Sequence, residues 1–458
     1  MSTTSTTIEE PNPIESGAIA HSQTVEENLE HRAKIPEPMA PIVILNQYYV
    51  PDVASTGYLL HELATELVRL GYDVSATTCR PSYGPKDSWV DCPLKEKLNG
   101  VNVRRMSTTR FRKDSYVGRG INYMTFIVQL ALRMLFTSSP KKVYLYTTNP
   151  PFLGVIGAFV SLFRRHNYVV LLHDAYPQLA VWVGAIKAGG MIEKIWHKAN
   201  HFAYHRAMET IVLCEAAKEL VCAEYGIAPE KVHVIPNWAD GSLLKPMPKS
   251  ESQFAAQENL TEPFTLMYSG NLGLCYEYET ILDAAEILLD SNFRLVWVGS
   301  GGNKAWLTEQ IKKRGLTNTT MHPYQPFDML RDSLAACDAS LVTIAQGVEG
   351  MSYPSKLYSS VAMGLPVIAI SESKSELRDI VEQRDIGRWF NLGDGEGMAN
   401  GIKEMMQDRD RCVQQGINAR ELFEERFTRA ISAQSYAKVL NRAARKAKIK
   451  KGAEPKTA

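Results

Sequence analysis

The most specific chemical pattern in this sequence is EGMSYPSKLY, residues 349–358. It places Ser355 and Lys356 at the expected start of a helix, where free backbone N–H groups and a mobile ammonium lie together. That combination suits a pyrophosphate group, which carries several negative charges. A lysine that is merely solvated at a helix end is the simpler alternative.

Two glycine loops follow apolar runs and also suit phosphate. YSGNLG contains Gly270 and Asn271, and GSGG begins at Gly299. Glycine lets a backbone approach a diphosphate closely, although either loop could be an ordinary turn. Neither loop is followed by GKS or GKT, so a Walker A motif and ATP hydrolysis are disfavoured.

Polar residues at the ends of two earlier apolar runs are further candidates. Thr56 and Gly57 open a predicted helix, whose N–H groups could bind an anion, or the threonine could only cap the helix. His173 and Asp174 end the run VVLLHD. They could orient substrate hydroxyls, or they could be a satisfied histidine and a helix-capping aspartate.

Three histidines recur at helical spacing, but this pattern is only weak evidence for a metal site. His197, His201 and His205, with Glu193 one turn before, share one helical face. They span about 12 Å, too far for all three to bind one ion, so a polar helix face is the better interpretation. We therefore expect no metal and no other cofactor.

Alternating strands and helices must position these residues. Short apolar runs alternate with amphipathic segments from residue 41 to 174, and the alternation restarts between 264 and 370. This pattern predicts the α/β class, with two Rossmann-like, doubly wound parallel sheets that face a cleft. Ligands are then expected at the carboxyl ends of the strands.

Composition and pattern divide the chain into five parts. Residues 236–263 are rich in Pro, Ser, Asn and Gln, which predicts a linker around the boundary between the second and third parts. The parts are a disordered leader (1–38), a first Rossmann-like domain (39–240), a second one (241–427), a helix that packs back on the first domain (428–446) and a basic tail (447–458).

The charge balance argues against a nucleic-acid-binding protein. The formal net charge is +1 at pH 7, and an acidic leader and a basic tail leave a neutral body without the basic face that phosphate backbones require. Hydrophobic residues make up 45% of the chain, which excludes a mostly disordered protein. The seven cysteines form no CxxC pair, and the N-terminus lacks a secretory pattern, so we expect reduced thiols and a cytoplasmic location.

Two apolar segments raise the question of membrane contact. Residues 152–163 would span only about 18 Å as a helix, and 121–136 contains Gln129 and Arg133, so neither predicts a transmembrane helix. Buried core helices are the simpler interpretation. The alternative is docking on an anionic membrane surface, assisted by a basic stretch that contains Arg104, Arg105, Arg110, Arg112 and Lys113.

Taken together, the motifs resemble those of the family 4 glycosyltransferases, which are retaining enzymes of the two-Rossmann GT-B fold. The resemblance covers about residues 41–440 and looks closest to the subgroup that builds capsule, O-antigen and colanic-acid-type polysaccharides. The motifs occur in the expected order: QYYVPDVASTG, HDAYPQLAVWVG, VIPNWAD, YSGNLG, and PSKLY with GLPV.

The resemblance implies transfer of a sugar from a nucleotide diphosphate sugar to a hydroxyl of a lipid-linked or other glycan precursor, by an enzyme peripheral to the cytoplasmic face of the membrane. The first domain would bind the acceptor and the second the donor, with the NWAD segment at the hinge between them. The candidate catalytic residues are Lys356, Ser355, His173, Asp174 and Glu349. The candidate donor-binding residues are Thr56, Gly57, Gly270, Asn271, Gly299, Tyr324, Gln325, Tyr353, Pro354 and Ser359, with Tyr324 and Gln325 near the nucleotide base.

Two features depart from the family pattern. Many members have two glutamates with seven residues between them, for the donor sugar and the ribose, whereas this sequence has Met351 and Ser359 there and Glu349 two residues early. A phosphate-binding Arg and Lys after the first strand of the second domain are also missing. A non-catalytic sugar-nucleotide-binding protein and a sugar-nucleotide epimerase of the same fold are therefore the alternatives.

Overall fold

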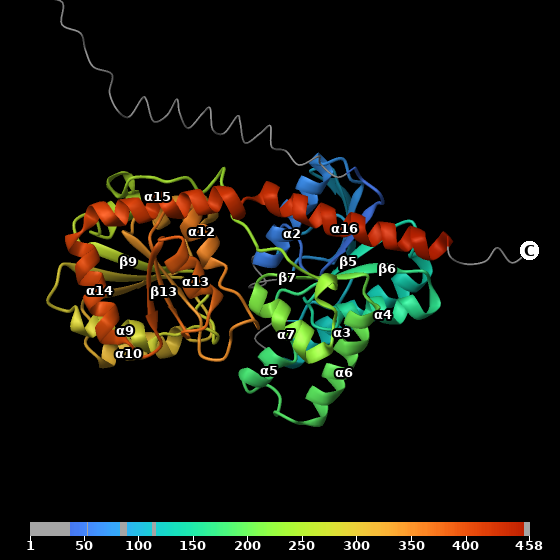
Figure 1. The fold of residues 1–458 in the computed structure, drawn as a ribbon, viewed down its shortest axis with the longest axis horizontal. Coiled ribbons are helices and arrows are strands. Elements are labelled where there is room, and N and C mark those ends of the chain that lie inside the picture. The colour runs from blue at the N-terminus through green and yellow to red at the C-terminus, as the bar shows by residue number, and fades with distance from the viewer. Residues whose placement is uncertain (1–36, 53, 83–88, 112–115, 453–458) are drawn as a thin grey trace, which may run out of the picture. The chain divides into compact units, whose positions relative to one another are not determined.

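The computed structural model describes residues 37–52, 54–82, 89–111 and 116–452. Most of the predicted leader, the end of the predicted tail, and the basic residues Arg112 and Lys113 lie outside these ranges. Within them the chain forms two largely parallel sheets with helices on their faces (Figure 1). The predicted α/β class with two Rossmann-like, doubly wound sheets is confirmed.

The first sheet has the strand order β3-β4-β2-β1-β5-β6-β7-β8. Every neighbouring pair is parallel except β3 and β4, which are antiparallel at one edge. The central strands are buried along their whole length because helices cover both faces. The strands are β1 (Ile42–Leu45), β2 (Val74–Cys79), β3 (Lys95–Leu98), β4 (Val101–Met106), β5 (Val143–Thr147), β6 (Asn167–Leu171), β7 (Glu209–Val212) and β8 (Val232–Val234).

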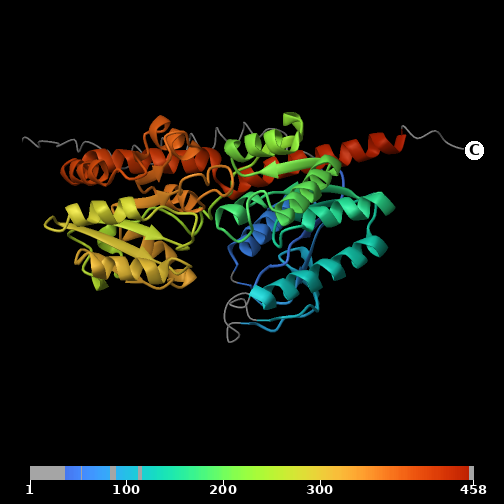
Figure 2. The same cartoon turned by 90° about the horizontal axis from the view of Figure 1, so that it is seen from below.

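Helices from distant parts of the chain cover the two faces of this sheet. One apolar core joins the sheet to α2 and α16, and a second core joins it to α3, α4 and α6. Figure 2 shows α16 and α3 over opposite faces. The helices are α2 (Ser55–Arg69), α3 (Tyr116–Thr137), α4 (Leu153–Phe163), α5 (Gln178–Trp182), α6 (Met191–Arg206), α7 (Glu215–Tyr225) and α16 (Arg429–Gly452).

The second sheet is parallel throughout, with the order β11-β10-β9-β12-β13-β14. Its strands are β9 (Phe264–Ser269), β10 (Phe293–Val298), β11 (Thr319–His322), β12 (Ala339–Thr343), β13 (Val367–Ser371) and β14 (Gly387–Asn391). Its helices are α8 (Gln253–Gln257), α9 (Glu279–Ile287), α10 (Lys304–Lys313), α11 (Leu330–Ala335), α12 (Lys356–Ala362), α13 (Glu376–Gln383), α14 (Gly395–Gln407) and α15 (Arg409–Arg426).

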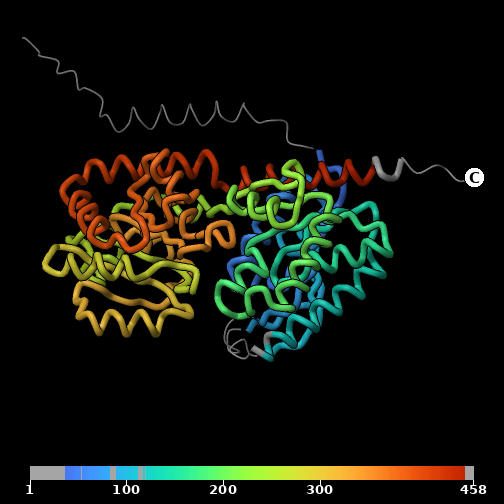
Figure 3. The backbone as a smooth tube through the Cα atoms, turned by 60° about the horizontal axis from the view of Figure 1, so that its bottom comes forward, coloured from blue at the N-terminus to red at the C-terminus, as the bar shows by residue number. Residues whose placement is uncertain are grey.

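The chain runs between the two sheets twice, as Figure 3 traces. The outgoing segment and the returning segment meet at an isolated bridge between Ala239 and Thr428. Immediately after this bridge α16 begins and packs against α2, β5 and β6. The helix continues to Gly452, six residues beyond the predicted helix end at 446.

Helix α3 has one buried and one exposed apolar face. Phe126, Leu130 and Met134 are buried in the first domain, which agrees with the core-helix interpretation for that face. The opposite face is also apolar yet exposed, and Phe136 keeps 79% of its surface accessible. No helix in the described residues combines the length and hydropathy needed to cross a bilayer.

Candidate functional site

Most of the predicted site residues follow the carboxyl ends of strands. In both sheets the strand order reverses direction beside the first strand, at β1/β5 and at β9/β12, and such switch points are where parallel sheets bind ligands. Each candidate loop begins directly after a strand: Thr56 and Gly57 after β1, His173 and Asp174 after β6, Gly270 and Asn271 after β9, Gly299 after β10, Tyr324 and Gln325 after β11, and residues 349–356 after β12.

Lys356, the first residue of α12, carries a buried ammonium between two tyrosine rings. Its side chain is only 6% exposed. Nζ lies 3.7 Å from the ring centre of Tyr276 and 4.4 Å from that of Tyr268, and it donates to the backbone oxygen of Asn271 at 3.3 Å. No carboxylate pairs with it among the described residues. Burial lowers the pKa of Lys356 from 10.5 to about 7.

The two glycine loops are packed too tightly for side chains. Gly270 has a φ of +137° and Gly299 a φ of +148°, a region that favours glycine. A Cβ on Gly270 would lie 3.0 Å from the Cε of Lys356, and one on Gly299 would overlap the Gly270 carbonyl. Gly270 therefore allows backbone to approach the Lys356 side chain closely, and Gly299 allows the loop after β10 to approach the backbone of Gly270.

Asp174 lies within electrostatic range of this site. Its carboxylate accepts a hydrogen bond from the Ser352 hydroxyl at 2.9 Å, and its negative charge raises the pKa of Tyr276 in addition to the larger effect of burial. Burial raises the pKa of Asp174 itself, while the Ser352 hydroxyl lowers it. The loop after β6 and the loop after β12 are further joined by the Ala175 N–H, which donates to the Met351 carbonyl at 2.7 Å.

His173 is half-buried and uncharged at neutral pH. Burial lowers the pKa of its imidazole to about 4, and Nε2 has no hydrogen-bond partner among the described residues. The ring lines a small cavity with Gly350, Ser352 and Tyr353. An orphaned ring nitrogen beside a cavity can accept or donate one hydrogen bond to a ligand hydroxyl.

Glu349 turns toward a helix of the second domain. Its Oε1 accepts a hydrogen bond from the backbone N–H of Glu376, the first residue of α13, at 3.0 Å. Burial raises the pKa of the Glu349 carboxyl to about 7, and Oε2 has no partner in the described part of the chain. Oε1 thus caps α13, while Oε2 can still form a hydrogen bond with a ligand.

The remaining predicted residues divide into buried and accessible groups. The hydroxyl of Tyr353 is buried without a partner in the described structure, and Pro354 is buried, whereas Ser355 is exposed immediately before α12. The Ser359 hydroxyl donates to the Lys356 carbonyl at 3.0 Å, and a serine at this position supplies no carboxylate for a ribose. Tyr324 is exposed and donates to the Ser300 carbonyl, and the Gln325 amide donates to that of Pro323.

The loop after β1 holds Thr56 and Gly57 in the first turn of α2. The helix begins without a side-chain cap, so the capping alternative for Thr56 is not observed. A Cβ on Gly57 would lie 3.2 Å from the backbone of Tyr49, and glycine therefore allows α2 to pack against its own entry loop.

Sequence reasoning missed the two tyrosines that enclose the Lys356 ammonium. Tyr268 and Tyr276 flank the glycine loop YSGNLGLCY, at the point where the family pattern would place a basic residue. The aromatic residues on both sides of a glycine loop were the available signal, because aromatic faces attract cations.

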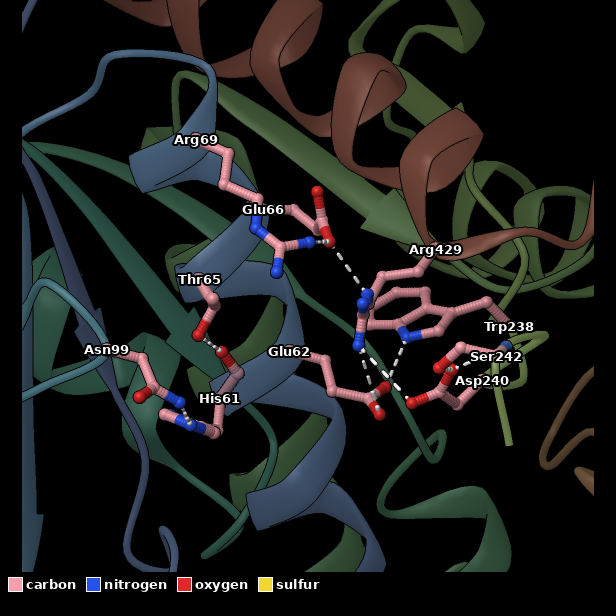
Figure 4. Close-up of polar contacts among 10 residues, drawn as sticks. All are labelled: His61, Glu62, Thr65, Glu66, Arg69, Asn99, Trp238, Asp240, Ser242 and Arg429. Carbon is pink, nitrogen blue, oxygen red and sulfur yellow. Dashed lines mark hydrogen bonds and ion pairs between the residues drawn. The ribbon is translucent and has the colours of Figure 1, made fainter. Parts of the chain in front are cut away.

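A charged cluster surrounds the predicted hinge segment (Figure 4). Trp238 donates through Nε1 to Glu62 of α2 at 2.7 Å, and Arg429 at the start of α16 bonds to Glu66 at 2.8 Å. Arg429 also lies 3.5 Å from Asp240. These contacts bind α2, the outgoing segment and the returning helix together.

The three histidines of α6 contact one another or Tyr225. His201 and His205 stack with ring centres 4.1 Å apart, while His197 stacks on Tyr225. Among the described residues no group of three or more His, Cys, Asp or Glu side chains could hold a metal ion.

Family models match both sheets of the chain. The model described as "Glycosyl transferase 4-like domain" matches residues 56–238, and "Glycosyl transferases group 1" matches residues 249–422. A putative colanic acid biosynthesis glycosyl transferase, WcaI of Escherichia coli K12, is 32% identical over 74% of this chain and 86% of its own. The probable glycosyltransferase WbjE of Pseudomonas aeruginosa is 22% identical over 87% of this chain and 97% of its own.

Solved structures share the fold. HepE of Anabaena in complex with UDP has a TM-score of 0.66 and 18% identity, covering 88% of this chain and 99% of its own. WaaG, a glycosyltransferase involved in lipopolysaccharide biosynthesis, has a TM-score of 0.59 and 15% identity, covering 87% of this chain and 99% of its own.

Proposed function

Because this chain belongs to the group 1, family 4 glycosyltransferases, which are retaining enzymes of GT-B fold, we propose that it moves a sugar from a nucleotide diphosphate sugar to a hydroxyl of a lipid-linked glycan precursor in surface polysaccharide synthesis. The observation that carries the donor part is the buried Lys356 ammonium, which no described carboxylate neutralises. The Gly270 loop brings backbone beside it, and the Gly299 loop packs against the Gly270 loop, so a diphosphate could supply the missing negative charge.

In the proposed reaction the acceptor oxygen forms a bond to the anomeric carbon as the bond from that carbon to the diphosphate oxygen breaks. The acceptor proton passes to the departing phosphate oxygen on the same face, so configuration is retained. Lys356 stabilises the charge that grows on the diphosphate, and such preorganised contacts typically contribute about 10²–10³-fold in rate. Asp174 and His173 would orient hydroxyls of the sugar or the acceptor.

The donor assignment can be tested by ligand-dependent thermal unfolding. UDP-sugars are the first donors to try, because the related fold of HepE was solved with UDP and with UDP-glucose, followed by GDP- and ADP-sugars. A donor at 100 times its Kd should add about 2.7 kcal/mol to the free energy of unfolding. Lys356→Ala should lose this shift, whereas Lys374→Ala, at an exposed lysine of the same domain, should keep it.

Turnover distinguishes the enzyme from the alternatives. Release of the nucleotide diphosphate only when an acceptor is present supports the transferase, and conversion of the sugar nucleotide without acceptor would support an epimerase. If no donor changes the unfolding temperature of the wild type, the donor site is assigned wrongly.

The proposal that the acceptor is lipid-linked is supported by an exposed apolar surface on the first domain. We call this surface the α3/α4 patch. Charge complements it, since Arg164 is exposed directly after α4 and follows Phe163, which is 65% exposed. The patch consists of Val117, Ile121, Met124, Val128, Leu132 and Phe136 of α3 with Phe159, Leu162 and Phe163 of α4.

The basic stretch expected to assist docking is distributed differently. Arg105 is buried and ion-paired with Glu96, so it contributes nothing to the surface. Arg110 lies over the Trp89 ring at 5.5 Å. We propose that the α3/α4 patch lies on the cytoplasmic face of an anionic membrane, with its apolar side chains in the headgroup region.

Vesicle sedimentation tests this docking. Leu132→Ser with Phe136→Ser should reduce binding to phosphatidylglycerol vesicles and raise KM for a lipid-linked acceptor, without changing turnover of a water-soluble one. The matched control is Val413→Ser with Ile417→Ser on α15, which removes two exposed apolar side chains from the second domain. Equal vesicle binding by all three proteins would contradict the membrane assignment.

A further inference from the structure

A second cationic site lies in the first domain, near the amino-terminal parts of the strands. The cavity has a volume of about 520 Å³. Its floor includes early residues of β1, β2, β4 and β5, and its wall includes the last turn of α3. The donor site proposed above lies after the carboxyl ends of strands, so this cavity is separate from it.

The lining of the cavity is strongly basic. Glu96, the one acidic side chain among its described lining residues, is already ion-paired with the buried Arg105. None of the lining cations has an ion-pair partner within the described ranges. These cations are Lys95, Lys97, Arg104, Arg133 and Lys142.

Two of the cations oppose each other directly. Lys95 of β3 and Arg104 of β4 are Cα partners in the antiparallel pair, so their side chains leave the same face of the sheet. Like charges directly opposite each other on neighbouring strands destabilise a sheet. An anion between them would remove this repulsion.

Arg133 contributes an unsatisfied donor. Its Nε is buried and has no hydrogen-bond acceptor in the described structure. A buried donor without a partner costs free energy, and a guanidinium is built to bind the oxygens of a phosphate through two parallel bonds. Ser75 and Thr77 line the same cavity and add hydroxyl donors, whereas the Thr137 hydroxyl already donates to the Arg133 carbonyl at 2.8 Å.

We propose that this cavity, named here the sheet-edge pocket, binds an anion that carries one or more phosphate groups. The cations oppose its charge, the arginines bind its oxygens, and 520 Å³ admits a phosphate with an organic substituent. The phosphate could belong to a free phosphate ester or to a lipid headgroup. The proposal does not depend on the donor assigned to the other site.

Calorimetric titration with inorganic pyrophosphate tests the pocket. Lys356→Ala serves as the background, because it removes the cation at the other candidate phosphate site. We expect saturable binding of one pyrophosphate, weakened about tenfold or more in Arg133→Gln and in Arg104→Gln, since each removes a charged hydrogen-bond donor. Lys141→Gln removes a neighbouring exposed charge outside the lining and should leave the Kd unchanged.

Thermal unfolding provides an independent measurement. Without ligand, Arg104→Gln should unfold at a higher temperature than its parent because the repulsion from Lys95 is gone. Pyrophosphate at the same concentration should raise the unfolding temperature of the parent more than that of this variant. The proposal would be overturned by a pyrophosphate Kd that is equal in the parent, Arg133→Gln, Arg104→Gln and Lys141→Gln. It would also be overturned if neither pyrophosphate nor vesicles bound in a way that depends on Arg104 and Arg133.

Vesicles distinguish the two sources of the phosphate. If Arg104→Gln and Arg133→Gln sediment less with phosphatidylglycerol vesicles than the parent does, and pyrophosphate displaces the parent from them, the ligand is a lipid headgroup. If pyrophosphate binds through the arginines while sedimentation is unchanged, the ligand is a free phosphate ester. Both outcomes support a phosphate site.

Discussion

The two cationic sites of this protein hold positive charge in opposite ways. At Lys356 a single ammonium is buried between Tyr268 and Tyr276, and its pKa is lowered to about 7. At the sheet-edge pocket several cations gather around a cavity, and each is exposed or only partly buried. A buried charge responds to pH and little to salt, whereas clustered surface charges respond to salt and little to pH. The comparison therefore predicts that phosphate binding at the two sites can be separated.

The largest effect is expected from removing the buried charge. Lys356→Ala should lower kcat/KM by about 10²-fold or more, because nothing else in the described site opposes the charge on the departing diphosphate. Steady-state kinetics with the identified donor gives the value, and Arg104→Gln should retain wild-type kcat with a soluble acceptor. If Arg104→Gln lost as much as Lys356→Ala, the two sites would not be independent.

Raising the pH should weaken donor binding next most strongly. Above pH 7 the unliganded Lys356 is increasingly neutral, and an anionic donor must bind a proton with it, so Kd should rise by up to about tenfold per pH unit. Calorimetry between pH 6 and 9 measures this.

The pH dependence of the free energy of unfolding checks the low pKa of Lys356 independently. The folded pKa of about 7 lies below the ordinary 10.5, so the unfolded chain binds more protons between these values. The free energy of unfolding should therefore rise with pH through this window as the cost of burying the charge disappears. Lys356→Met should lack that rise, and an identical pH profile in wild type and Lys356→Met would refute the low pKa.

Changing one wall of the tyrosine enclosure should have a smaller effect. Tyr276→Leu removes the ring nearest Nζ and should lower kcat/KM by about threefold to tenfold, since a cation–ring contact contributes about 0.5–2 kcal/mol. Tyr276→Phe keeps the ring and should remain close to wild type in the same assay. Equal losses in both variants would assign the effect to the hydroxyl group.

A change in salt concentration should produce the smallest difference between the two sites. Raising NaCl from 50 to 200 mM should weaken pyrophosphate binding at the sheet-edge pocket several-fold more than donor binding at Lys356, because exposed charges are screened and buried ones are not. Calorimetry at the two salt concentrations, on Lys356→Ala for the pocket and on Arg133→Gln for the donor site, checks this. A steeper salt dependence at Lys356 would reverse the comparison.

Much of the fold was predictable because parallel sheets leave a regular pattern. The alternation of apolar runs and helices predicted both sheets, and the order of the motifs along the chain indicated the family; both predictions are confirmed. The strand-end loops were also located correctly in the sequence, since glycines after apolar runs indicate close backbone approach.

The local chemistry was harder to predict because it depends on contacts between distant segments. Tyr276 meets Lys356 across 80 residues, and Glu349 caps a helix that begins 27 residues later. The sheet-edge pocket could not be predicted for the same reason: Lys95 and Arg104 become neighbours only because β3 pairs antiparallel with β4. Spacing along the chain does not reveal any of these partners.

The returning helix α16 has a consequence for how the protein is made. Ala433, Tyr436, Ala437 and Leu440 complete the apolar core that the first sheet shares with α2, although nearly two hundred residues of the second domain are synthesised in between. On the ribosome the second domain can finish folding before α16 has been synthesised and has packed on the first domain. A nascent or truncated chain that ends before residue 429 therefore exposes apolar sheet surface and becomes a substrate for chaperones and proteases.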